Sequence, residues 1–146
     1  MQRSEWTFQA AVEVTCNLFS IHACQFILGQ SLDQVKFYEN HDLAGYLSKT
    51  PDWMEPQYAL LMFVLMIEHF GWDSMYKFLR EYEEDIVREI KGLPRTDVDR
   101  VDQWVVRYSR LVGRNVKEHF VMFGLVVSEW VDEELCRLET WHACEF

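Results

Sequence analysis

Apolar residues recur at three- and four-residue spacing along nearly the whole chain, which is the period of α-helices that bury one face. Glycine and proline residues interrupt this period at intervals typical of helix ends. No alternation with a period of two and no hairpin-turn signal competes with it. The sequence therefore predicts an all-α fold of about six to seven helices, with no linker or repeat that divides the chain.

These interruptions place the expected helices along the chain. Pro56 suits the first turn of a helix, because it lacks the N–H group that this position leaves unbonded, and Gly71 is suited to end that helix. We expect helices over about residues 8–28, within 30–53, over 56–70, from an Asp73 cap to a break at 92–94, from a Thr96 or Asp97 cap to Gly113, over 115–123, and from a Ser128 cap to 138.

The charge balance limits the partners that the chain can bind. Its 146 residues carry a formal net charge of -10, and no basic patch offsets it. An acidic surface repels phosphate backbones, so we expect no nucleic-acid partner. No run of about eighteen uncharged apolar residues is present, so we expect no membrane-spanning segment. The 49% of hydrophobic residues is enough to form a core.

The four cysteines do not form a recognisable metal or redox motif. Cys16, Cys24, Cys136 and Cys144 are each at least seven residues apart, so none belongs to a C-x-x-C pair. Apolar neighbours favour reduced thiols over a disulfide framework, because a free cysteine behaves as a small hydrophobic residue. This pattern leaves the redox compartment open.

Glu13 is the one formal charge between Phe8 and Gln30, in a stretch that is otherwise apolar, small or neutral on all sides of the helix. A helix that is apolar all round is normally buried, and a buried carboxylate needs a cation, a metal or several hydrogen-bond donors. Asn17 lies one turn later on the same face. Two interpretations stay open: a carboxylate with a specific partner, or one that points to water and favours the helix dipole.

The residues around Glu13 also carry a family resemblance. Trp6-Thr7-Phe8 followed by Glu13-Val14-Thr15-Cys16-Asn17-Leu18-Phe19-Ser20 resembles the signature that follows the H-E-x-x-H motif in the enhancin-like, mucin-degrading zinc metallopeptidases, peptidase family sixty. The animal TRP-channel-associated factors are among the relatives. Six further segments agree in the same order, namely residues 58–70, 70–73, 78–82, 102–109, 112–115 and 120–128.

The resemblance implies a fold and a metal site. The fold would be the C-terminal helical part of a gluzincin-like metallopeptidase domain, occupying residues 1–146 and beginning just after the H-E-x-x-H helix. In the family the two histidines of that motif bind zinc, the glutamate between them is the general base, and a glutamate on the next helix is the third protein ligand. By this resemblance Glu13 is the third zinc ligand, and Asn17 supports it.

The chain departs from the family pattern in its histidines. None of the five belongs to an H-E-x-x-H motif; they are His22, His41, His69, His119 and His142. Catalytic residues are therefore absent from the sequence as given, and the missing N-terminal half of the domain is the first partner that we expect. We predict that zinc belongs to the intact domain, and that this chain alone neither binds it stoichiometrically nor hydrolyses peptides.

The remaining conspicuous residues have plain structural interpretations. We expect packing roles for His22 and for the tryptophans and methionines at helical spacing, Trp72, Trp104, Trp130, Met62 and Met66. His69 is suited to a helix end. Arg107 and Arg114 are expected to lie at the surface or in ion pairs.

Two functions follow from the resemblance. In the first, these helices provide Glu13 and one wall of a cleft for glycoprotein or peptide substrates. In the second, the domain is a non-catalytic interaction module, as in the channel-associated factors, and binds a partner such as a membrane channel. The reading frame upstream of Met1 distinguishes them, because an intact H-E-x-x-H favours the first and a degraded one favours the second.

Overall fold

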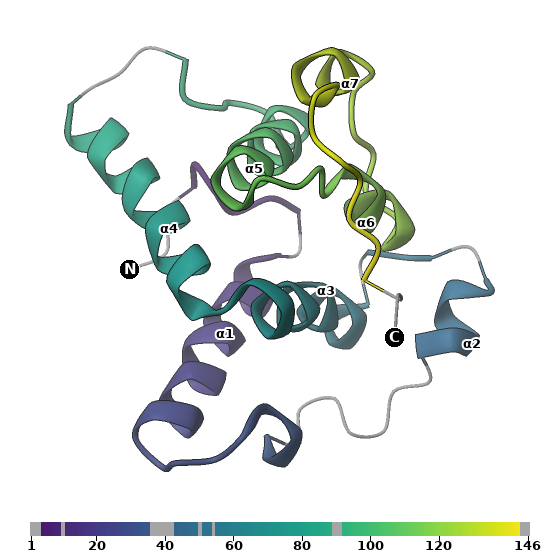
Figure 1. Ribbon diagram of the computed structural model, residues 1–146. Helices are drawn as coiled ribbons and strands as arrows, with labels where there is room; N and C mark the ends of the chain where they lie inside the picture. The colour runs from purple at the N-terminus through teal and green to yellow at the C-terminus, as the bar shows by residue number, and fades with distance from the viewer. Residues whose placement is uncertain are drawn as a thin grey trace.

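A computed structural model describes residues 4–9, 11–35, 43–49, 51–53, 55–88 and 92–143. Within these ranges the chain forms seven α-helices, one 3-10 turn and no β-strand, which confirms the all-α prediction. The elements, shown in Figure 1, are α1 (Ala11–Phe26), η1 (Leu32–Gln34), α2 (Leu43–Leu47), α3 (Pro56–Phe70), α4 (Trp72–Val87), α5 (Asp97–Val112), α6 (Lys117–Met122) and α7 (Trp130–Leu135).

Helix α3 lies at the centre of the fold (Figure 1), with α1 packed along one side and α4 following it directly. Its nine consecutive residues from Ala59 to Ile67 are all buried. A helix buried on every side must be apolar on every side, which explains why this segment is the most hydrophobic of the chain. α5 in turn packs against α4, α6 and α7, so these helices assemble the second half of the molecule.

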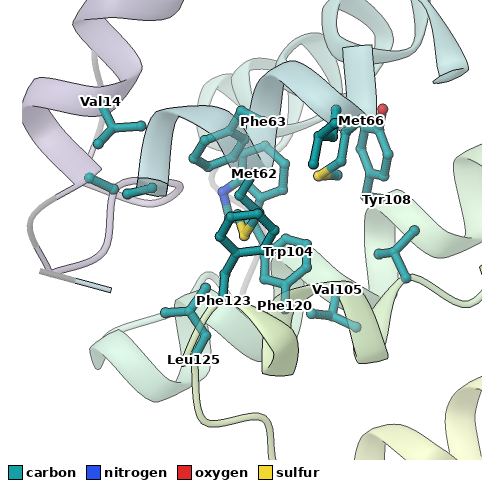
Figure 2. Close-up of a cluster of buried hydrophobic side chains, with 14 of the residues drawn as sticks. Val14, Met62, Phe63, Met66, Trp104, Val105, Tyr108, Phe120, Phe123 and Leu125 are labelled. Carbon is teal, nitrogen blue, oxygen red and sulfur yellow. The ribbon is translucent and has the colours of Figure 1, made fainter. Parts of the chain in front are cut away.

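The core joins α3 to α5 and α6. Figure 2 shows Phe63 and Met62 of α3 close to Trp104 of α5, with Phe120 and Phe123 beside them. The rings of Phe63 and Trp104 lie 5.2 Å apart in an edge-to-face arrangement, which is favourable for aromatic pairs. The predicted packing roles of Trp104, Met62 and Met66 are confirmed, because all three are fully buried.

Several predicted helix ends are confirmed. Pro56 begins α3, and Gly71, with a φ of 78°, follows its last residue. Thr96 caps α5: its side chain accepts a hydrogen bond from the Asp99 N–H group, and Asp99 reciprocates in a capping box. Gly113 ends that helix in the left-handed conformation, with a φ of 70°.

Other boundaries differ from the prediction. Gly71, not Asp73, is the N-cap of α4, because α4 begins only one residue after α3 ends. Glu129, not Ser128, precedes α7, and that helix ends at Leu135. The first helix is also shorter than expected, covering Ala11–Phe26.

The segment after α6 folds back along the molecule. The Asn115 N–H donates to the Glu139 carbonyl at 2.8 Å, and the Trp141 N–H donates to the Asn115 carbonyl at 2.9 Å. The Trp141 ring lies against the rings of Phe70 and His119, at 4.8 and 4.6 Å between centroids. Residues 125–143 are thereby held against α3, α5 and α6.

In the part of the chain that the structure describes, every helix is too short or too polar to cross a membrane.

Candidate functional site

Glu13 is exposed in the first turn of α1, on the side opposite to the core. The buried residues of α1 form a stripe that faces α3, namely Ala11, Val14, Thr15, Leu18 and Ile21. Of the two interpretations of Glu13 that the sequence leaves open, its exposure within this chain agrees with a carboxylate that points to water near the start of the helix. The helix is apolar all round, but this chain covers only one of its sides.

The uncovered side of α1 has an unusual composition for a surface. We call it the outward face, and define it as the exposed residues Val12, Glu13, Cys16, Phe19 and Ser20. Val12 is 54% exposed and Phe19 is 48% exposed. Glu13 is the only charge on this face, and it stands near the N-terminal end of α1, where the helix dipole favours a negative charge. Asn17, one turn later, is half-buried beside it.

The described residues supply few metal ligands around Glu13. Among residues 4–9, 11–35, 43–49, 51–53, 55–88 and 92–143, no three His, Cys, Asp or Glu side chains gather where they could hold a metal ion. Glu13 is a chemically suitable zinc ligand, since zinc sites commonly include a carboxylate oxygen. Alone, one carboxylate could supply only one of the several ligands that a zinc site needs.

The histidines of the described residues have structural surroundings. His22 is half-buried and stacks on Phe26 at 4.4 Å, with Trp72 and Tyr76 meeting its ring edge-on at 5.0 and 5.5 Å. The packing interpretation of His22 is confirmed. His69, in the last turn of α3, lies against Phe70 and Trp141, with 4.6 and 5.2 Å between ring centroids. His41 lies outside the described residues.

Asp102 is a buried carboxylate that sequence reasoning missed. Asp102 is 2% exposed in α5 and accepts two hydrogen bonds, from the Ser128 N–H at 2.9 Å and from the Trp130 indole N–H at 3.0 Å. These donors satisfy the carboxylate and fasten the start of α7 to α5. Trp130 is 47% exposed, so it is not a core residue, and it contacts α5 through this hydrogen bond.

His119 is a second buried polar residue that the sequence did not single out. Its Nε2 lies 2.9 Å from the Met62 carbonyl, and Nε2 is the donor because a carbonyl oxygen only accepts. Burial lowers the pKa of His119 to about 4, and the hydrogen bond to Met62 opposes this shift only in part. His119 is therefore neutral at physiological pH and acts as a core residue.

The predicted ion pairs of two arginines are present. Arg107 binds Asp85 at 2.7 Å and lies over the Tyr82 ring at 4.3 Å, and Arg114 pairs with Glu139. Of the cysteines, Cys16, Cys24 and Cys136 are free thiols, and Cys144 lies outside the described residues.

Comparison with known proteins places this arrangement in a family. The chain is 28% identical over 149 aligned residues to TRPM8 channel-associated factor 3 of Rattus norvegicus and to TRPM8 channel-associated factor 1 of Homo sapiens. TRPM8 channel-associated factor 2 of Homo sapiens is 26% identical over 151 residues. Each alignment covers 96% of this chain but only 16% of the relative, so the chain spans about a sixth of their length.

No solved structure matches the chain significantly. The family model described as peptidase M60, enhancin and enhancin-like, matches residues 1–124, which include all of α1 to α6 and therefore Glu13. On this match over most of its length, the chain belongs to the enhancin and enhancin-like peptidase M60 family.

Proposed function

We propose that the chain is the C-terminal helical part of an M60-type peptidase domain, in which Glu13 supplies one protein ligand to a zinc ion. The position of Glu13 carries this proposal. The single charged side chain of α1 stands on a face that this chain's core leaves uncovered and that is otherwise apolar, small or neutral. A carboxylate in such surroundings is suited to a site that a second element completes.

The H-E-x-x-H helix expected upstream of residue 1 is the proposed second element. It would cover Val12 and so remove apolar surface from water, at roughly 25 cal/mol per Å². Val14, Leu18 and Ile21 anchor α1 on α3 and hold Glu13 in a fixed place. Asn17 is placed to orient the carboxylate, as residues next to metal ligands commonly do.

A bound zinc ion would polarise a substrate carbonyl and provide an activated water for hydrolysis. Glu13 contributes negative charge and one oxygen ligand to that site, and α1 forms one wall of the proposed cleft. The substrates that the family resemblance implies are glycoproteins or peptides.

The upstream reading frame and the zinc content test this proposal together. We expect an in-frame H-E-x-x-H that ends within a few residues of Met1, and one zinc per molecule in the extended protein, measured by mass spectrometry of the metal. Glu13→Gln should weaken zinc binding by at least about tenfold. Glu133→Gln, an exposed glutamate of α7, is the control and should leave zinc binding unchanged. Equal zinc retention in both variants would contradict a ligand role for Glu13.

The 146-residue chain by itself should behave differently. We expect no stoichiometric zinc at micromolar metal, because one carboxylate does not bind Zn²⁺ tightly. One tightly held zinc per chain in equilibrium dialysis, lost in Glu13→Ala, would overturn this expectation.

Non-catalytic protein binding is the second candidate function. The C-terminal end of α1 favours it, because Phe26 is 62% exposed and Ile27 and Leu28, which follow, are more exposed still. Contiguous exposed apolar residues mark interaction surfaces. The relatives are named channel-associated factors, which supports a protein partner. An upstream motif in which either histidine is replaced would favour this function over catalysis.

A further inference from the structure

A cavity of about 180 Å³ lies between α1 and α4. Thr15, Leu18, Phe19 and His22 of α1 line it, and Glu13 does not. It is therefore separate from the proposed zinc ligand. Trp6 and Trp104, both buried, form its floor, and the half-exposed rings of Phe19 and Tyr76 lie at its mouth.

Three polar groups of this cavity have partners inside the protein. The Trp104 indole N–H donates to the Trp6 carbonyl at 2.8 Å, and the Trp72 indole N–H donates to the Gln25 side-chain carbonyl. The Thr15 hydroxyl donates to the Ala11 carbonyl at 2.8 Å. Water needs two to four polar partners to stay in a cavity, so a lining of this kind favours an apolar occupant.

The size of the cavity indicates how large that occupant is. An apolar cavity of about 150 Å³ stays dry and binds benzene. At about 180 Å³, this one accommodates a single aromatic side chain. No Lys, Arg, Asp or Glu is among the described residues that line it, so the group that enters is neutral.

The residues around the mouth of the cavity indicate which kind of molecule provides the aromatic side chain. Beyond Phe19 and Tyr76 the apolar surface continues over Phe26, which stacks on His22, so the exposed apolar area is wider than one ring. Asp73 lies one turn before Tyr76 in α4, which places a carboxylate near the mouth. Burial, and next the negative charge of Asp73, raises the pKa of Tyr76. The whole chain carries a net charge of -10, which attracts a basic partner.

We infer that this pocket receives one aromatic side chain from a basic segment of a partner protein. The inference rests on the second proposed function, protein binding, and is independent of zinc and of Glu13. A ring in a dry pocket, surrounded by flanking contacts that exclude water, is the usual arrangement of an interface hot spot.

Two synthetic peptides test the inference on the full 146-residue chain. One is Lys-Lys-Ala-Trp-Ala-Lys-Lys, and the other has alanine in place of tryptophan. We expect the tryptophan peptide to bind at least about tenfold more tightly by calorimetry, as an anchoring ring does. We also expect it to shift the methyl NMR signals of Met75 and Leu79, which line the pocket.

Equal affinities of the two peptides would overturn the inference. Binding of the tryptophan peptide that leaves the Met75 signal unmoved would also overturn it, but would leave protein binding by another surface intact. These outcomes on the unmodified chain do not depend on whether a variant folds.

Matched variants locate the binding. Leu79→Trp fills the pocket from α4 and should lower the affinity for the tryptophan peptide by at least about tenfold. Val87→Trp makes the same change at an exposed position of α4 outside the pocket and should leave the affinity unchanged. Phe19→Ser removes one side of the mouth, and Val12→Ser, at a similarly exposed position of α1, is its control. Equal effects within either pair would contradict binding at this pocket.

Discussion

Helices α1 and α5 are both sixteen residues long, but they differ in how their outer sides are made. α5 buries an apolar face that includes Trp104 and Tyr108, and its outer side is charged and paired, with Arg107 bound to Asp85 and Arg110 to Glu134. α1 buries a comparable stripe, but its outward face exposes Val12 and Phe19 and carries one charge. From this difference we infer that the outer side of α5 is suited to water, whereas the outward face of α1 is suited to contact with a further protein segment.

The largest effect that would separate the two helices is on stability. We expect Trp104→Ala to lower the free energy of unfolding by about 3–5 kcal/mol, since it empties a buried site and removes the hydrogen bond to Trp6. Phe19→Ala should lower it by less than about 1 kcal/mol, because that ring is half exposed in the folded chain. Urea denaturation measures both. Similar losses would show that the outward face of α1 is packed in solution.

We expect acid to lower the free energy of unfolding through His119, which is buried in α6 against Met62 of α3. The folded pKa of His119 is about 4 and its ordinary value is 6.5, so the unfolded chain binds the proton more readily between these values. The contribution of His119 to the free energy of unfolding is therefore fully present above about pH 6.5 and decreases by up to about 3 kcal/mol as the pH falls toward 4. Denaturation of His119→Gln across this range should show a smaller decrease. An equal decrease in the variant and in the wild-type chain would contradict this role of His119.

The next largest effect on stability should distinguish the buried carboxylate of Asp102 from the exposed carboxylate of Glu13. Asp102→Ala should lower the free energy of unfolding by about 1–3 kcal/mol, because the Ser128 and Trp130 N–H groups lose their acceptor. Glu13→Ala should change it by less than about 0.5 kcal/mol, as is usual for an exposed side chain. Thermal and urea unfolding of the two variants provide the comparison. A large loss in Glu13→Ala would show that this carboxylate has a structural partner.

The change with the smallest expected effect on stability should alter self-association of the chain instead. Replacing Val12 and Phe19 together by lysine should reduce self-association in sedimentation experiments, because exposed apolar surface promotes it. The same replacement of Val98 and Leu111, which are the exposed apolar residues of α5, should have less effect. A wild-type chain that remains monomeric at high concentration would show that the outward face does not cause association.

Short-range signals made much of the fold predictable. Pro56 at the start of α3, the Thr96 capping box and Gly113 at the end of α5 depend on residues a few positions apart, and the structure confirms each. Asp73 failed as a predicted cap because α4 starts so soon after α3 that Gly71 serves both helices. Composition alone could not reveal that the connection is this short.

The site was less predictable, because burial depends on which elements meet. Glu13 was identified from its apolar surroundings and from the family resemblance, but its exposure could not be read from a helix that is apolar all round. Asp102 looked like an ordinary charge in α5, since its two donors come 26 and 28 residues later. His119 meets the Met62 carbonyl across 57 residues. Contacts at such separations leave no local pattern in the sequence.

The fastening of residues 125–143 has a practical consequence for cloning. The family match ends at residue 124, yet Val131, Leu135 and Trp141 beyond it are buried. A gene trimmed to the match would encode a protein that lacks both donors to Asp102 and leaves the rings of Phe70 and His119 without Trp141. Expression boundaries for this helical unit, and for relatives aligned to it, are better set after Ala143.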